Sequence, residues 1–190
     1  MKVQYILIFL CLGLVGLAWT PATPQSHKRA GSAKVITRPS FDNPELPYDA
    51  GTVRFLALSE ETKGAWSMFE VKEMPGYKTA WHRHNERDEA FYILEGVLTM
   101  KIGDRIGEYP AGSYIVVPRG TPHGQGNFGT VPTRVLLTFT PAGFDEFFRD
   151  RVELFKTVKP GDPTFAEKFN ELRKKHSGHV QILGTWDPKK

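Results

Sequence analysis

The sequence has a single cysteine, Cys11, and no acidic residue before Asp42. The lone cysteine excludes an intramolecular disulfide framework, and a chain without one tolerates an oxidising compartment. Five of the 25 basic residues precede position 39, and the remaining 20 stand against 21 acidic residues, a balance of −1. The net charge of +4 therefore arises near the N-terminus. Because nucleic-acid binding requires a basic face on the fold itself, we expect no nucleic-acid partner.

Long apolar runs are also missing, with one exception near the N-terminus. Lys2 is followed by an almost unbroken apolar run at Tyr5–Ala18, and Thr20, Pro21 and Ala22 offer a small-residue cleavage site. The run has the length of the apolar region of a signal peptide and is short for a spanning helix, which needs about 20 apolar residues. We predict a signal peptide over residues 1–22, with an uncleaved anchor as the alternative. The protein is then secreted or periplasmic, with no further membrane contact.

Short strands separated by turns dominate the middle of the chain. Residues 23–40 are polar and basic and predict a flexible linker, whereas the pattern changes from Thr52 onward. The expected strands are Val53–Leu58, Ala65–Val71, Lys78–His84, Glu89–Leu94, Val97–Ile102, Ser113–Val117 and Arg134–Thr140. Glycine-containing turns stand between these strands, and no helical segment separates them. The pattern favours an antiparallel barrel or sandwich over residues 41–140 and argues against a βαβ sheet.

After Thr140 the apolar spacing becomes helical. Phe144, Phe147 and Phe148 are spaced for one face of a short helix. A second helix is expected to be capped by Asp162, with Pro163 in its first turn and a buried stripe of Phe165, Phe169 and Leu172. The run 179–183 is expected to form one more strand. Residues 141–190 therefore predict a C-terminal helical extension that packs on the barrel.

Metal-ligand residue types occur at short spacing in the segment Gly76–Gly96. It reads G-x5-H-x-H-x4-E-x6-G, which places His82 and His84 two residues apart and Glu89 after a polar turn. Residues two apart in a strand face the same side, so the two imidazoles project together and the carboxylate returns beside them. Two imidazoles and one carboxylate suit Fe(II), Mn(II), Ni(II), Cu(II) or Zn(II). The segment predicts a site for one divalent metal ion.

A second segment supplies a further candidate ligand. Gly112–Asn127 reads G-x5-P-x-G-x2-H-x3-N, and its His123 begins a strand from which it can point inward as the fourth ligand. Gln125 shares the strand face of His123 and is expected to contact a substrate in the cavity. Phe91 shares the face of Glu89 and is our candidate pocket aromatic, with core packing as the open alternative.

Together the two segments resemble the paired motifs of the cupin superfamily. All ten fixed positions match in order, and 15 residues (97–111) separate the two motifs. The stretches "PRGTPHGQGN" and "TPAGFDEFF" are similar to the single-domain, quercetin-dioxygenase-like branch. The resemblance implies an all-β double-stranded β-helix, which is a jelly-roll barrel with the metal inside, and a homodimer. The branch often has an aromatic residue where this chain has Gln125; its flanking residues, Gly124 and Gly126, remove further bulk near the metal.

The function that the resemblance implies is that of a metal-dependent dioxygenase acting on a hydroxylated or enolisable small molecule. In this reading Glu89 is both a metal ligand and the catalytic base. A non-oxidative isomerase, cyclase or lyase remains an alternative, as does a non-catalytic exported protein that binds a small ligand. Export disfavours Fe(II), because ferrous iron is hard to keep reduced outside the cell, and so favours Mn, Ni, Cu or Zn.

Overall fold

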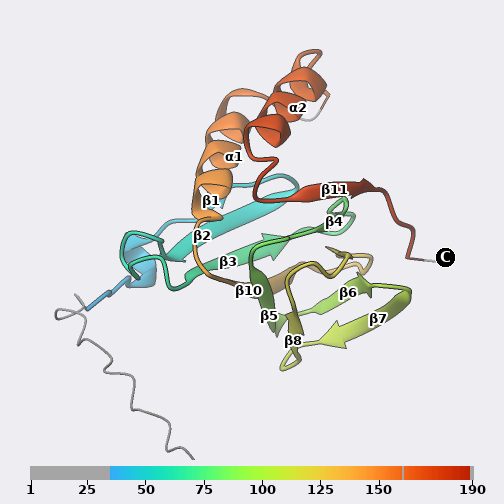
Figure 1. Cartoon of the computed structure of the whole chain (residues 1–190), viewed down its shortest axis with the longest axis horizontal. Coiled ribbons are helices and arrows are strands. Elements are labelled where there is room, and N and C mark those ends of the chain that lie inside the picture. The colour runs from blue at the N-terminus through green and yellow to red at the C-terminus, as the bar shows by residue number, and fades with distance from the viewer. Residues whose placement is uncertain (1–34, 160, 189–190) are drawn as a thin grey trace, which may run out of the picture. The chain divides into compact units, whose positions relative to one another are not determined.

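The computed structural model describes residues 35–159 and 161–188. These residues form two antiparallel sheets followed by a pair of helices (Figure 1). The first sheet has the order β1-β2-β3-β10-β5-β8, with β1 Leu46–Pro47, β2 Gly51–Ala57, β3 Ser67–Glu73, β10 Thr133–Thr140, β5 Asp88–Glu95 and β8 Tyr114–Val117. The second has the order β11-β4-β9-β6-β7, with β11 Gln181–Gly184, β4 Trp81–Arg83, β9 His123–Gly126, β6 Val97–Ile102 and β7 Arg105–Pro110. A short 3-10 helix at Ser40–Asp42 precedes the strands.

Alternating burial explains why these segments form a closed two-sheet structure. In β3 and β10 every second residue is buried, and the register places Phe69 opposite Leu137 and Val71 opposite Val135. An apolar face with a period of two must be covered, and the second sheet and the helices cover it. The predicted all-β fold, a jelly-roll barrel with a C-terminal helical part, is confirmed.

Each predicted strand is present, but one predicted strand is shorter than expected and the strand β7 was not predicted. The expected strand Lys78–His84 is reduced to β4, because Lys78 makes only an isolated bridge with Gly126 before the chain enters the ladder. The residues of β7 are exposed or half-buried and include Gly107 and Pro110, so this strand lacks an apolar alternation and is held by its hairpin partner β6.

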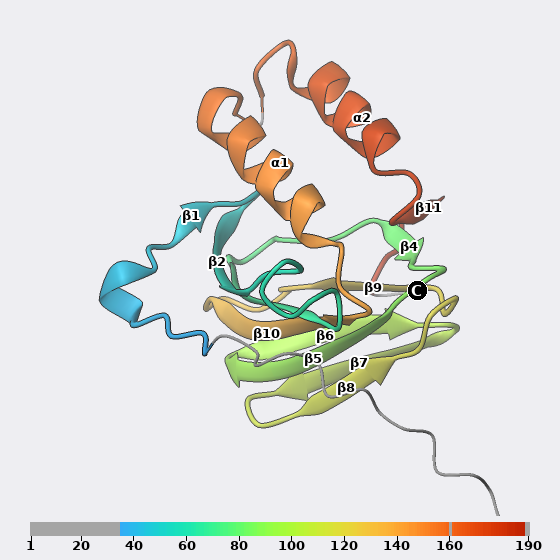
Figure 2. The ribbon, with the colours of Figure 1, turned by 60° about the vertical axis from the view of Figure 1, so that its left-hand side comes forward.

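The C-terminal extension contains helix α1 (Asp145–Thr157), helix α2 (Phe165–Lys175) and strand β11. Figure 2 shows both helices on one side of the strands, with the chain after α2 returning to β11 beside β4. The predicted start of the second helix is wrong. Asp162 accepts hydrogen bonds from the backbone N–H and the hydroxyl of Thr164, which makes a turn, and the helix begins only at Phe165.

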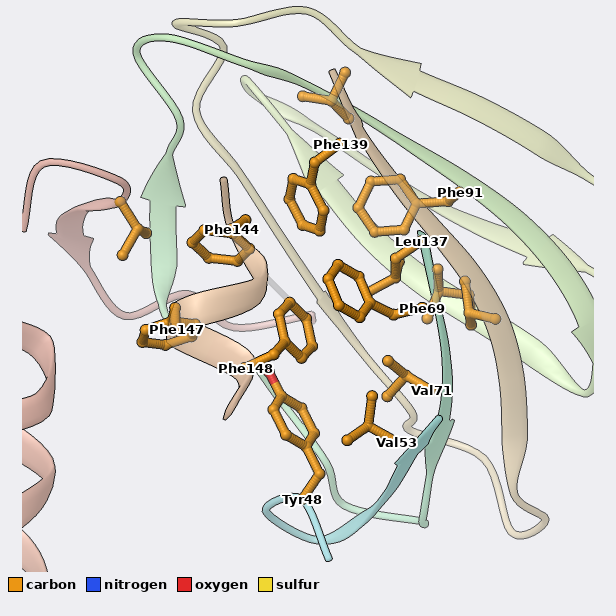
Figure 3. Packing of buried hydrophobic residues seen from close by; sticks show 14 of the residues in the cluster. Tyr48, Val53, Phe69, Val71, Phe91, Leu137, Phe139, Phe144, Phe147 and Phe148 are labelled. Carbon is orange, nitrogen blue, oxygen red and sulfur yellow. The ribbon is translucent and has the colours of Figure 1, made fainter. Parts of the chain in front are cut away.

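Phenylalanine rings join helix α1 to the first sheet. The ring of Phe148 stacks on Phe69 at 4.3 Å between centroids and on Tyr48 at 5.0 Å, while Phe144 packs on Phe139 at 4.6 Å. Figure 3 shows these rings between the helix and the strands, with Tyr48 just after β1 contributing a further ring. The expected apolar helix face therefore buries against the barrel, as the spacing of its phenylalanines predicted.

Some predictions concern residues outside the described ranges. The signal peptide or anchor over 1–22 lies wholly outside them, as does the linker up to residue 34. Within the described ranges, no helix has both the length and the apolar character needed to cross a membrane.

Candidate metal centre

Three strands bring four potential ligands together. His82 in β4 lies directly opposite His123 in β9, His84 follows β4, and Glu89 is the second residue of β5. One donor atom from each residue lies within 4.8 Å of the other three, and all four side chains are buried. The structure thus assembles the predicted set: two histidines come from the β4 segment, His123 comes from its neighbour β9, and Glu89 comes from β5 in the other sheet.

Each histidine of the cluster is oriented by a backbone carbonyl. The Nδ1 atoms of His82, His84 and His123 lie 2.8, 2.8 and 2.9 Å from the carbonyl oxygens of Ala80, His179 and Thr121, respectively. A carbonyl oxygen only accepts, so each Nδ1 carries the proton and donates it. The Nε2 atoms remain as the ligand atoms, and those of His84 and His123 lie 3.2 and 2.9 Å from the Glu89 carboxylate. This is the arrangement that supports metal-binding histidines.

The charges of the cluster favour a cation. Burial, with the neighbouring His123 and His84, lowers the pKa of His82 to about 3, so this imidazole is neutral. Burial by itself would raise the pKa of Glu89, but hydrogen bonds with His123 and His84 hold it well below its usual range. Burial would lower the pKa of His123, but the Glu89 carboxylate, at 2.9 Å from Nε2, raises it. The cluster therefore contains a buried, ionised carboxylate beside three imidazoles, and its N and O donors fit a divalent metal ion.

The C-terminal extension supports this centre in a way that the sequence did not indicate. The carbonyl oxygen of His179, just before β11, accepts the hydrogen bond from His84. The ring of Phe144 meets the ring of His84 edge-on at 4.8 Å between centroids. His176, in the same extension, is buried and pairs with Asp150. Residues 95 positions apart meet here, so no local spacing signals the contact.

A cavity of about 160 Å³ opens beside the cluster. Its wall includes His82, His84 and Glu89, and the helices contribute aromatic rings and two arginines. Its volume is close to that of a roughly 150 Å³ protein cavity known to hold one benzene molecule. The cavity therefore has room for one ring beside the candidate ligands, and a three-ring molecule would extend out of it.

Gln125 lies on the cavity wall, as its strand face predicted. Its side-chain N–H donates a hydrogen bond of 2.9 Å to Glu73, a fully buried carboxyl at the end of β3. The expectation that Gly124 leaves open space near the metal is wrong. A Cβ at Gly124 would lie 2.4 Å from the indole nitrogen of Trp186, so the indole fills the space that the glycine leaves.

Phe91 does not line this cavity. The side chain is fully buried, and its ring packs edge-on against His123 at 6.3 Å between centroids. The strand face was predicted correctly, but the inward face of a barrel includes packed core as well as cavity. The core-packing alternative fits its position, and the aromatic wall comes from the helices instead.

Comparisons with known sequences agree with this arrangement. A family model described as a cupin domain matches residues 69–139, which run from β3 to β10 and contain all four candidate ligands. An uncharacterized protein of Methanocaldococcus jannaschii is 33% identical over 109 residues, covering 56% of this chain and 87% of that protein. The tetracenomycin polyketide synthase protein TcmJ of Streptomyces glaucescens is 25% identical over 118 residues, covering 61% of this chain and 65% of that protein.

Solved structures share the barrel. The structure of KdgF from Halomonas sp. aligns with a TM-score of 0.54 at 17% identity, covering 60% of this chain and 99% of that chain. A predicted oxalate decarboxylase from Thermotoga maritima aligns with a TM-score of 0.52 at 18% identity, covering 56% and 99%. At these identities the similarity shows the fold. The alignments cover almost the whole of both solved chains but only 60% and 56% of this protein. About two fifths of its residues therefore lie outside the shared barrel.

Proposed function

The chain belongs to the cupin family, and from that premise we propose that it is a metal-dependent enzyme, a dioxygenase acting on a small hydroxylated or enolisable molecule. The observation that carries the proposal is the position of the four-residue cluster at the wall of a cavity. Three imidazoles oriented by carbonyl groups and one carboxylate surround a common point. An active site commonly consists of a metal or cofactor site at the wall of a pocket that can hold a small molecule.

The residues divide into those that hold the metal and those that handle the substrate. His82, His84 and His123 present their Nε2 atoms as fixed ligands, and a divalent ion held there would polarise a substrate oxygen as a Lewis acid. Glu89 reaches the same point from β5 and also lines the cavity. We assign it a second role as the base that takes the proton of the substrate hydroxyl or enol. Gln125 lies on the same wall and offers its amide to the bound molecule.

Metal analysis of the purified protein tests the first part. About one equivalent of a divalent metal per chain is expected, and the double change His82→Ala with His123→Ala should abolish uptake. His27→Ala, in the predicted linker, is the matched control and should retain the metal. If the predicted export holds, Mn, Ni, Cu or Zn is expected in preference to Fe. A protein that neither contains a metal nor takes one up on titration would contradict the proposal.

Oxygen consumption separates the possible activities. The metal-loaded protein is incubated with single-ring enols, β-diketones and hydroxylated acids while dissolved oxygen and products are followed. Product formation with oxygen uptake supports the dioxygenase. Product formation without uptake replaces it with an isomerase, cyclase or lyase, and tight binding without turnover replaces it with a binding protein.

A further inference from the structure

Two arginines of the C-terminal helices line the same cavity as the candidate metal ligands. Arg151 comes from α1 and Arg173 from the last turn of α2, and the wall that they share includes His82, His84 and Glu89. Neither arginine belongs to the segment that matches the cupin family, which ends at residue 139. The positive groups are therefore an addition that the helical extension makes to the barrel.

Arg151 is buried and incompletely satisfied. It pairs with Asp49 in the turn between β1 and β2, and its guanidinium lies 4.6 Å from the ring of Tyr48 and 5.0 Å from that of Phe169. Only 9% of the residue is exposed, and its Nε atom has no hydrogen-bond partner among the described residues. A buried guanidinium with an unused donor retains capacity for another acceptor.

In the described part of the chain, no carboxylate forms a hydrogen bond or an ion pair with Arg173, and Asp49 acts on it only through its charge. Its guanidinium carbon lies over the ring of Phe169, 4.5 Å from the ring centroid. Burial, together with the positive charge of Arg151, lowers the pKa of Arg173, and the negative charge of Asp49 partly opposes this shift. Two guanidinium groups thus approach the same phenylalanine. Asp49, which also lines the cavity, is ion-paired with Arg151 and leaves the hydrogen-bond donors of Arg173 without a carboxylate acceptor.

A structural role for Arg173 does not account for this position. Basic residues in the last turn stabilise a helix through its dipole, and Arg173, Lys174 and Lys175 all lie there. The two lysines are exposed and suffice for that role, whereas Arg173 alone among the three turns to the cavity wall. The other cationic group on the wall, Lys78, donates to the carbonyl oxygen of Trp186.

We propose that the helical end of the cavity is an anion subsite, in which Arg173, supported by Arg151, binds the carboxylate of a small planar acid. This inference rests on the proposed function, since it places the opposite end of the same molecule at the metal cluster. Guanidinium groups match carboxylates in a planar, two-pronged geometry, and the aromatic rings between the two ends suit a flat apolar body. The volume of about 160 Å³ restricts that body to about one ring. The substrate class is thus a single-ring or shorter acid that also carries a hydroxyl or enol group.

Benzoate and its neutral isostere benzamide test the subsite by calorimetric titration of the purified full chain. Benzoate is expected to bind more tightly than benzamide, and Arg173→Gln should reduce that preference about tenfold, which corresponds to about 1.4 kcal/mol. Arg173→Lys should retain part of it, because the charge remains while the planar fork is lost. Arg149→Gln is the matched control: it lies on α1, is exposed, pairs with Glu60 and does not line the cavity.

The result that overturns the inference is a benzoate-to-benzamide ratio unchanged in Arg173→Gln, or equal weakening of both ligands. Metal content and thermal unfolding are measured on every sample, so that loss of folding is recognised directly. A sample that holds metal but shows no dependence on Arg173 refutes the subsite and leaves the metal site standing. A sample without metal that still prefers benzoate through Arg173 supports the subsite and counts against the proposed enzyme.

Discussion

Replacing Glu73 with glutamine is expected to make the folded chain more stable at neutral pH. Glu73 is fully buried; its Oε1 accepts the hydrogen bond from Gln125, and its Oε2 has no partner among the described residues. Burial raises the pKa of Glu73 from its ordinary value of 4.5 to about 8; the hydrogen bond from Gln125 opposes this rise, and the negative charge of Glu89 adds to it. The carboxyl is therefore neutral in the folded chain at pH 7.

The size of the effect follows from the two pKa values. Below pH 4.5 the carboxyl is protonated in both the folded and the unfolded chain, and it adds no pH dependence. Between pH 4.5 and about 8 the unfolded chain ionises and the folded chain does not, so stability falls as the pH rises through this window. The free energy of unfolding falls by about 1.4 kcal/mol per pH unit in this window. It is therefore lower by about 3 kcal/mol at pH 7 and by about 5 kcal/mol above pH 8. Glutamine does not ionise, so the variant escapes this loss.

Urea unfolding of the native chain and Glu73→Gln between pH 4.5 and 8.5 measures the difference. A chelator is present throughout, so that metal binding does not contribute to the free energy of unfolding. Groups that titrate in both proteins cancel, and the difference should grow by about 3 kcal/mol from pH 4.5 to 7. Glu108→Gln, an exposed carboxylate of β7, is the control. A difference that does not vary with pH, or that varies equally in the control, refutes the reasoning.

Two further substitutions test how the C-terminal segment docks. Gly124→Ala should lower the free energy of unfolding by about 1–3 kcal/mol, because the new Cβ would lie 2.4 Å from the indole of Trp186. The control Gly178→Ala should not lower it, because nothing lies within 4 Å of that position. Equal losses for the two variants in urea unfolding would contradict the contact with Trp186. Phe148→Ala should lower the free energy of unfolding by about 3–5 kcal/mol, because the ring is buried between helix α1 and the first sheet. Phe128→Ala should lower it clearly less, because Phe128 is 41% exposed. A small loss for Phe148→Ala would mean that α1 contributes little to the core.

Much of the candidate site was predictable because its residues are close in sequence. His82, His84 and Glu89 lie on one strand-turn-strand segment, so the period of two in a strand determines which side chains share a face. His123 needed the pairing of β4 with β9, and the second motif carried that information by resemblance. Strand parity also predicted Gln125 correctly. It failed to separate core from cavity at Phe91, because parity defines a face and not a depth along the barrel.

Sequence alone therefore predicted the barrel and the convergence of the four candidate ligands, because both depend on short-range periodicity and on motifs whose fixed spacing resembles that of the cupin superfamily. Only the tertiary structure decided three features: the hydrogen bond from His84 to the carbonyl of His179, the indole of Trp186 over Gly124, and the arginines on the cavity wall. The hydrogen bond from His84 to His179 joins residues 95 positions apart, and the one from Trp186 to Thr79 joins residues 107 positions apart. Such contacts become possible because phenylalanine packing docks the C-terminal extension on the barrel. Hydrophobic burial has no direction of its own, so the amphipathic pattern predicts that the helices pack and leaves open which polar groups they bring to the site.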